Sequence, residues 1–140
     1  MIVLDTNVVS ELMREAPADA VQQWFDQQQL QDLAVTSIAI GEIQRGLYRL
    51  PEGKRRRRLI ASFEAFVREG FSGRVLSYDE HAANVFGMLA AEREGAGYNT
   101  DPVDLMIAAT ARSHHAAIAT RNMRDFAGCG IAIINPWAAS

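Results

Sequence analysis

The sequence has few of the residues that stabilise secreted proteins or that cross a membrane. Cys129 is the only cysteine among 140 residues, so no intramolecular disulfide can form and nothing argues for an oxidising compartment. No apolar run approaches the roughly 18 residues that a membrane-spanning helix needs, and no basic segment precedes an apolar one as in a signal peptide. We therefore expect no membrane anchor and a cytoplasmic location.

Lysine is almost absent and the net charge is slightly negative. Lys54 is the only lysine, and 14 basic residues against 17 acidic ones give a net charge of -3. Any binding of nucleic acid must then use a local basic patch instead of a global positive field. One such patch exists, because Arg55 and three more arginines follow Lys54, with Arg45 and Arg49 shortly before them. A solvated helix face is the alternative, since consecutive positions spread around a helix.

Short apolar runs alternate with amphipathic segments along the chain. The runs predict buried strands at residues 1–4, 33–35, 75–76, 117–120 and 131–134. Between them, helical periodicity predicts helices from residue 5 or 6 to 13, from 16 or 17 onward, from 36 or 37 to about 50, from about 54 to 70, from a capping box at 77–80 to about 94, and from 101 to 114. This alternation predicts an α/β fold with a mainly parallel sheet of about five strands and helices on both faces. No linker or repeat interrupts it, so residues 1–140 are expected to form a single domain.

Acidic residues follow or cap several of these elements. Asp5 comes directly after the first strand, where open α/β sheets hold their ligands, although an Asp before Thr also caps helices. Asp104 lies in the first turn of a helix that Asp101 already caps, and Glu42 borders the apolar stripe of its helix. Carboxylates that converge without cations between them repel one another and usually bind a hard divalent metal. We therefore interpret these acids as a candidate metal site.

Four segments together resemble a known family. Residues 1–8 (MIVLDTNV), 36–43 (TSIAIGEI), 104–111 (DLMIAATA) and 120–126 (TRNMRDF) stand in an order and at separations that are similar to a PIN-domain ribonuclease of the VapC toxin type, from a type II toxin-antitoxin system. The resemblance extends to residues 50–55 and 134–137. It implies a three-layer fold in which the first and fourth strands lie side by side at the centre of the sheet.

The resemblance also implies site residues. The family's three core metal-binding acids map onto Asp5, Glu42 and Asp104, and either Asn122 or Asp125 occupies the fourth acidic place. Thr6, Asn7 and Thr120 are expected to hydrogen-bond the Asp5 carboxylate or a metal-bound water.

The donor chemistry and the resemblance together predict a reaction. A site of oxygen ligands, without His or Cys, suits Mg²⁺ or Mn²⁺ better than zinc. The predicted activity is hydrolysis of RNA phosphodiester bonds by a metal-activated water.

Partners are implied by the resemblance as well. A cognate antitoxin is expected to insert a segment into the acidic groove and to bind operator DNA through its other domain. The toxin itself is expected to form a homodimer. Candidate contacts to RNA or antitoxin are Arg45, Arg49, Lys54, Arg55 and Arg121. The aromatic residues of the predicted helices, Trp24, Phe25 and Phe63, are interpreted first as core residues and second as a dimer surface.

Three other functions use similar residues. A phosphotransfer receiver domain needs a further acidic pair and a late lysine, but Lys54 lies far from any predicted strand. A haloacid-dehalogenase-type phosphatase needs a second Asp just after Asp5, where Asn7 stands. A catalytically weak PIN module that only binds its antitoxin retains the same acids, and only metal-dependent cleavage distinguishes it from a nuclease.

Overall fold

The computed structural model describes residues 1–138, and in these residues five parallel strands form one sheet. The strands are β1 (Ile2–Leu4), β2 (Leu33–Thr36), β3 (Val75–Leu76), β4 (Ala117–Ala119) and β5 (Ile133–Ile134), in the order β3-β2-β1-β4-β5. In the central strand, Val3 lies opposite Ala34 of β2 and Ile118 of β4. The predicted α/β fold and the predicted contact between the first and fourth strands are confirmed.

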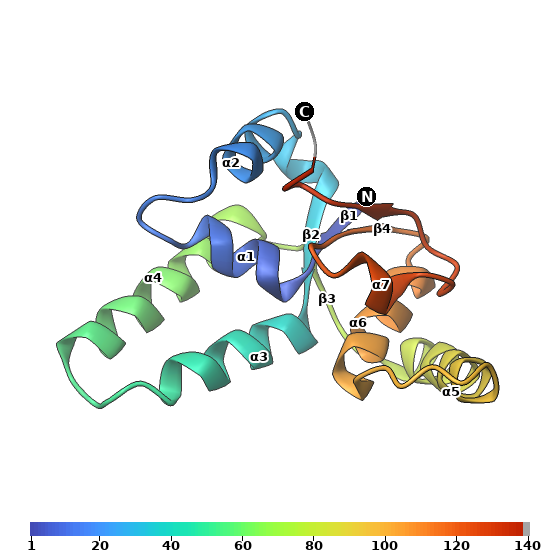
Figure 1. Ribbon diagram of the computed structural model, residues 1–140. Coiled ribbons are helices and arrows are strands. Elements are labelled where there is room, and N and C mark those ends of the chain that lie inside the picture. The colour runs from blue at the N-terminus through green and yellow to red at the C-terminus, as the bar shows by residue number, and fades with distance from the viewer. Residues whose placement is uncertain (139–140) are drawn as a thin grey trace.

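Helices cover both faces of this sheet. They are α1 (Thr6–Leu12), α2 (Asp19–Asp26), α3 (Ser37–Tyr48), α4 (Lys54–Gly70), α5 (Glu80–Gly95), α6 (Pro102–Ser113) and α7 (Met123–Phe126), with a 3-10 turn at Leu30–Asp32. In Figure 1, α1, α2 and α4 lie on one side of the strands, α5 and α6 lie on the other, and α3 runs below the sheet toward α4. None of the helices within residues 1–138 is long and apolar enough to cross a membrane.

The alternation of side chains along the strands divides the core into two halves. Val3 and Ile118 pack with the α5 and α6 layer, whereas their neighbours Leu4 and Ala119 pack with α1, α2 and α4. Both faces are apolar because each parallel strand is covered twice. Trp24 and Phe63 lie in the second half of the core, as expected from their apolar stripes, and Phe25 is partly buried against it.

Two helix starts differ from the prediction. Helix α2 begins at Asp19, two or three residues later than expected, and Ala18 at its cap provides no side-chain hydrogen bond. The predicted capping box at Ser77 does not form. The backbone N–H of Tyr78 donates to Ser37 Oγ, which keeps this segment beside α3, and Asp79 caps α5 by accepting from Ala82 N.

The region after β4 contains a helix that the periodicity did not predict. Strand β4 ends at Ala119 and β5 begins only at Ile133, so both late strands are shorter than expected. The short helix α7 lies between them with Asn122 at its N-cap, and Asp125 therefore lies inside the helix and not at its cap. Four helical residues are too few to show a period of 3.6.

Phe63 is the test residue for the packing of α4 on the sheet. It is 2% exposed and contacts the core half beneath α4. We expect Phe63→Ala to lower the free energy of unfolding by about 3–5 kcal/mol, because it leaves a cavity. Urea denaturation followed by circular dichroism measures this change.

The neighbouring residue Ser62 provides the matched control. Its side chain is exposed on the same helix, so Ser62→Ala should change the stability by less than about 0.5 kcal/mol. Equal effects of the two substitutions would show that α4 does not depend on Phe63.

Candidate functional site

Asp5 lies at the carboxyl end of the central strand. Its backbone N–H donates to the carbonyl of Ala119 at 2.9 Å, which extends the pairing of β1 with β4 by one residue. The side chain is only 2% exposed, and its Oδ1 accepts from the backbone N–H of Thr6 at 2.8 Å as the N-cap of α1. Asp5 is therefore a helix cap and, at the same time, a buried carboxylate at the edge where parallel sheets form sites.

The other oxygen of Asp5 connects the two central loops. Oδ2 accepts from Thr120 Oγ1 at 2.7 Å and from Asn7 Nδ2 at 3.2 Å. The amide oxygen of Asn7 in turn accepts from the backbone N–H of Arg121 at 3.2 Å. These contacts fix the orientation of the carboxylate between the loops that follow β1 and β4.

Glu42 reaches the same place from α3. Thr6 Oγ1 donates to Glu42 Oε1 at 2.7 Å, while the backbone of Thr6 holds Asp5. A single threonine thus bridges two carboxylates that are 37 positions apart in the sequence. The partner that the half-buried Glu42 requires is provided by the protein itself.

Asp104 enters from the first turn of α6. Asp101 caps this helix by accepting from Val103 N at 2.8 Å, so the Asp104 carboxylate is not needed as the cap. Its side chain is partly buried and lines the same cavity as Asp5 and Glu42. The structure therefore brings together three acids from β1, α3 and α6.

The carboxylates are crowded enough to change their titration. Burial, followed by the negative charges of Asp5, Asp101, Asp125 and Glu42, raises the pKa of Asp104 to about 7. Burial raises the pKa of Asp5 as well, and the charges of Glu42 and Asp125 add to this, although hydrogen bonds from Thr120 and Thr6 oppose it. Negative charge thus accumulates around Asp5 and Asp104, where neither Arg14 nor Arg121 offsets the rise in pKa, and a bound cation would relieve it.

The cavity has a volume of about 540 Å³. Of the residues proposed from the sequence, it is lined by Asp5, Thr6, Asn7, Glu42, Asp104, Arg121 and Asn122. Asp125 is not in this lining, although its charge acts on Asp5 and Asp104. Asn122 is exposed at the cavity, and its backbone N–H donates to Thr120 Oγ1 at 3.0 Å.

The acids share one cavity without forming a ready coordination sphere. Within residues 1–138, no three side chains of His, Cys, Asp or Glu lie in an arrangement that could already hold one metal ion. The donors that line the cavity are carboxylate, amide and hydroxyl oxygens, which are ligands that Mg²⁺ and Mn²⁺ prefer.

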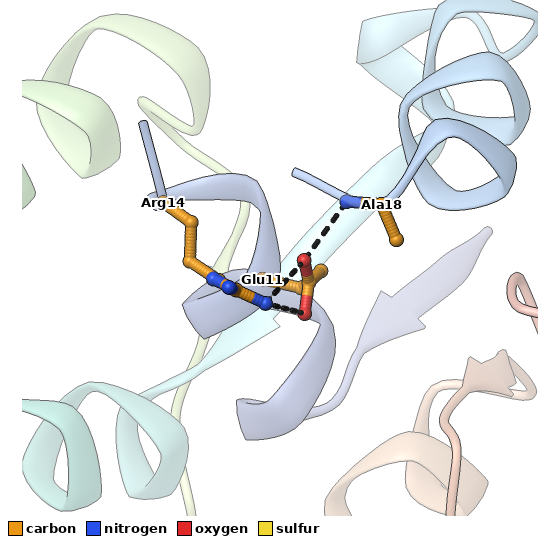
Figure 2. A network of polar contacts seen from close by, with 3 residues as sticks. All are labelled: Glu11, Arg14 and Ala18. Carbon is orange, nitrogen blue, oxygen red and sulfur yellow. Dashed lines mark hydrogen bonds and ion pairs between the residues drawn. The ribbon is translucent and has the colours of Figure 1, made fainter. Parts of the chain in front are cut away.

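Four further residues line the cavity, and the sequence reasoning did not assign them to it: Ser10, Glu11, Arg14 and Trp137. Glu11 is 8% exposed and accepts from Ala18 N at 2.9 Å and from Arg14 Nη1 at 3.2 Å (Figure 2). The Ala18 N–H, and then Arg14, lower the pKa of Glu11. Its position was accessible from the sequence, because Glu11 stands four residues after Asn7 and shares its helix face.

The basic residues that were proposed to contact RNA or an antitoxin lie in different parts of the structure. Arg121 lines the acidic cavity, where its guanidinium lies 5.1 Å from the centre of the Trp137 ring. Arg45 and Arg49 are exposed on α3 and line another cavity of about 370 Å³ between α3 and α6, which shares Glu42 with the acidic cavity. Lys54 and Arg55 are exposed in the first turn of α4.

Comparisons of the sequence and of the structure with known proteins point to the same family. The model of the PIN domain family matches residues 2–128. The chain is 40% identical over 137 residues to the VapC ribonuclease Y4jK of Sinorhizobium fredii, a match that covers 98% of each chain. The crystal structure of FitAcB from Neisseria gonorrhoeae matches with a TM-score of 0.92 and 34% identity over 99% of each chain. The structure of FitAB bound to a DNA fragment called IR36 matches with a TM-score of 0.93 and 34% identity, over 100% of this chain and 98% of that one.

The raised pKa of Asp104 has a consequence for stability. Between its ordinary value of 3.8 and about 7, the folded state holds a proton that the unfolded state has lost, so the free energy of unfolding falls as the pH rises through this range. We expect Asp104→Asn to raise the stability at pH 8 in EDTA by an amount of the order of 1–2 kcal/mol, after allowance for the partial exposure of the side chain.

Thermal denaturation from pH 4 to pH 8 measures this effect. The gain should be small at pH 4 and should grow toward pH 8. Asp79→Asn is the matched control, because Asn is also a good helix cap and Asp79 caps α5 outside the acidic cavity. A gain from Asp104→Asn that does not depend on pH would contradict the proposed crowding.

Proposed function

The chain belongs to the PIN-domain family, among the toxins of the VapC type, and on that premise we propose that it is an endoribonuclease that uses a divalent metal ion to hydrolyse RNA phosphodiester bonds. The observation that supports this best is the cavity in which Asp5, Glu42 and Asp104 converge from three elements. Their mutual repulsion and their oxygen donors suit Mg²⁺, with Mn²⁺ as the alternative.

The proposed roles follow from the position of each residue. Asp5, Glu42 and Asp104 would hold the ion, and Thr6 keeps the first two carboxylates in place by donating to both. Asn122 is exposed at the cavity and presents an amide that can orient a water molecule or a phosphate oxygen. A divalent metal ion held there would make water more acidic and would neutralise charge on the leaving oxygen.

Asn7, Thr120 and Asp125 would act through other residues. Asn7 and Thr120 donate to the Asp5 carboxylate and so hold it in one orientation, and the hydrogen bond from Thr120 opposes the rise of its pKa. Asp125 does not line the cavity, but its charge raises the pKa of both Asp5 and Asp104. We therefore assign the fourth position of the site to Asn122. Asp125 contributes only through its negative charge.

A protein partner belongs to the same proposal. The FitAB relative is described as a complex bound to DNA, and this chain matches it at 34% identity along its full length. We propose that the chain likewise pairs with an antitoxin, which brings operator DNA to the complex, and that it forms a homodimer and acts in the cytoplasm. A PIN module that binds the antitoxin without cleaving RNA is the second candidate function. The crowding of the acids favours the nuclease, because binding a protein does not require carboxylates that repel one another.

Cleavage by an Asp104 variant tests the nuclease directly. We expect Asp104→Asn to lower kcat/KM for a single-stranded RNA in Mg²⁺ by at least about 100-fold, because the cavity loses one of three charges that hold the ion. The measurement is cleavage of a labelled RNA by the purified chain in Mg²⁺ and in EDTA.

Asp79→Asn again provides the control, since it removes an equal charge from a helix cap outside the cavity lining. It should retain wild-type cleavage. Undiminished cleavage by Asp104→Asn, or wild-type cleavage in EDTA, would contradict the assignment. A folded wild-type chain that cleaves no RNA in Mg²⁺ or Mn²⁺ would favour the binding module.

A further inference from the structure

A second cavity lies beside the acidic one, between the end of α1 and the start of α4. It has a volume of about 570 Å³, and its charged lining is mainly basic, with Arg14, Arg55 and Arg58 against the single acid Glu15. We call it the basic cavity. In Figure 1, α1 and α4 lie on the same side of the sheet. Ser10 and Arg14 line both cavities, so the two hollows adjoin along one face of α1.

The five consecutive basic residues at the start of α4 do not share one role. Arg56 donates to the carbonyls of Tyr48 and Leu50, lies 3.8 Å from Glu52 and stacks over the Tyr48 ring, so it holds the loop between α3 and α4. Arg55 and Arg58, three positions apart on one helix face, point into the basic cavity instead. Arg57 is exposed and lies outside it.

Arg14 joins the two cavities and is held in place. Glu11 accepts from its Nη1 at 3.2 and 3.3 Å, and the same carboxylate is fixed by the N–H of Ala18 (Figure 2). The Arg14 side chain nevertheless remains 66% exposed. A guanidinium has five N–H donors, so Arg14 retains donors for an anion after it has bound Glu11.

The substrate of the proposed reaction needs positive charge next to the acids. RNA is a polyanion, the chain as a whole carries a charge of -3, and the acidic cavity repels phosphates. Three guanidinium groups in an adjoining hollow supply the missing attraction, and planar guanidinium groups suit phosphate oxygens.

We propose that the basic cavity is a subsite for a backbone phosphate of single-stranded RNA, one that flanks the bond positioned over Asp5, Glu42 and Asp104. This subsite rests on the proposed ribonuclease function. Arg14 contacts the RNA backbone where it passes from the acidic cavity to the basic cavity, and Arg55 and Arg58 bind the flanking phosphate. An acidic peptide would meet the same charges, but RNA is favoured because the cavity is continuous with the place where the cleaved phosphodiester must lie.

A pair of double variants with equal charge changes tests the subsite. Arg55→Gln/Arg58→Gln removes two charges from the basic cavity, and Arg57→Gln/Arg68→Gln removes two exposed charges elsewhere on α4. We expect the first variant to weaken the binding of a labelled single-stranded RNA by about 10-fold and to reduce the slope of log affinity against log salt by about 1.4, at roughly 0.7 for each phosphate contact. Its KM for cleavage should rise with little change in kcat.

The control variant should stay within about twofold of the wild type in both measurements, and thermal denaturation checks that both variants are folded. Equal losses in the two variants, or no loss in either, would overturn the subsite. So would a larger loss of binding to a glutamate-rich peptide than to RNA, which would assign the cavity to a protein partner. If the wild type binds RNA but does not cleave it, the proposed function fails, while the difference in binding still decides the subsite.

Discussion

The burial of one carboxylate at the end of the central strand is the constraint on which the rest of the site depends. Asp5 is almost inaccessible, and its two oxygens are held by Thr6, Asn7 and Thr120. A buried charge is tolerated only when donors surround it, so the loops after β1 and β4 must lie side by side. The sheet order β3-β2-β1-β4-β5 satisfies this requirement, and Asp104 and Glu42 complete the cavity from the helices on either side.

Charge is separated over a short distance around α1. Its start borders the crowded acids, and Arg14, two residues after its end, lies between these acids and the basic residues of α4. Glu11 makes this separation stable, because it neutralises part of Arg14 while it accepts from Ala18 at the connection to α2. One short helix therefore presents a region for a cation and a region for an anion, which is the pairing that a metal-dependent reaction on a polyanion requires.

Sequence reasoning succeeded where one local signal decided the structure and failed where tertiary contacts did. The apolar runs located the strands, Asp101 caps its helix as predicted, and Thr36 is the cap of α3 where either Thr36 or Ser37 was expected. The order of the strands came from resemblance to a family, since spacing does not determine which strands pair. Ser77 is not the cap of α5, because Asp79 takes that position, while the neighbouring Tyr78 N–H donates to Ser37, 41 residues away. The different roles of Arg55 and Arg56 depend on which side of α4 faces α1. A run of consecutive basic residues does not show which of them lies on that side.

The hydrogen bond between Thr120 and Asp5 joins residues that are 115 positions apart. During synthesis on the ribosome, β1 and its carboxylate emerge first, but the strand that completes their surroundings emerges among the last. A nascent or prematurely terminated polypeptide therefore possesses Asp5 without the pocket around it. The order of synthesis thus delays formation of the site until translation is nearly finished.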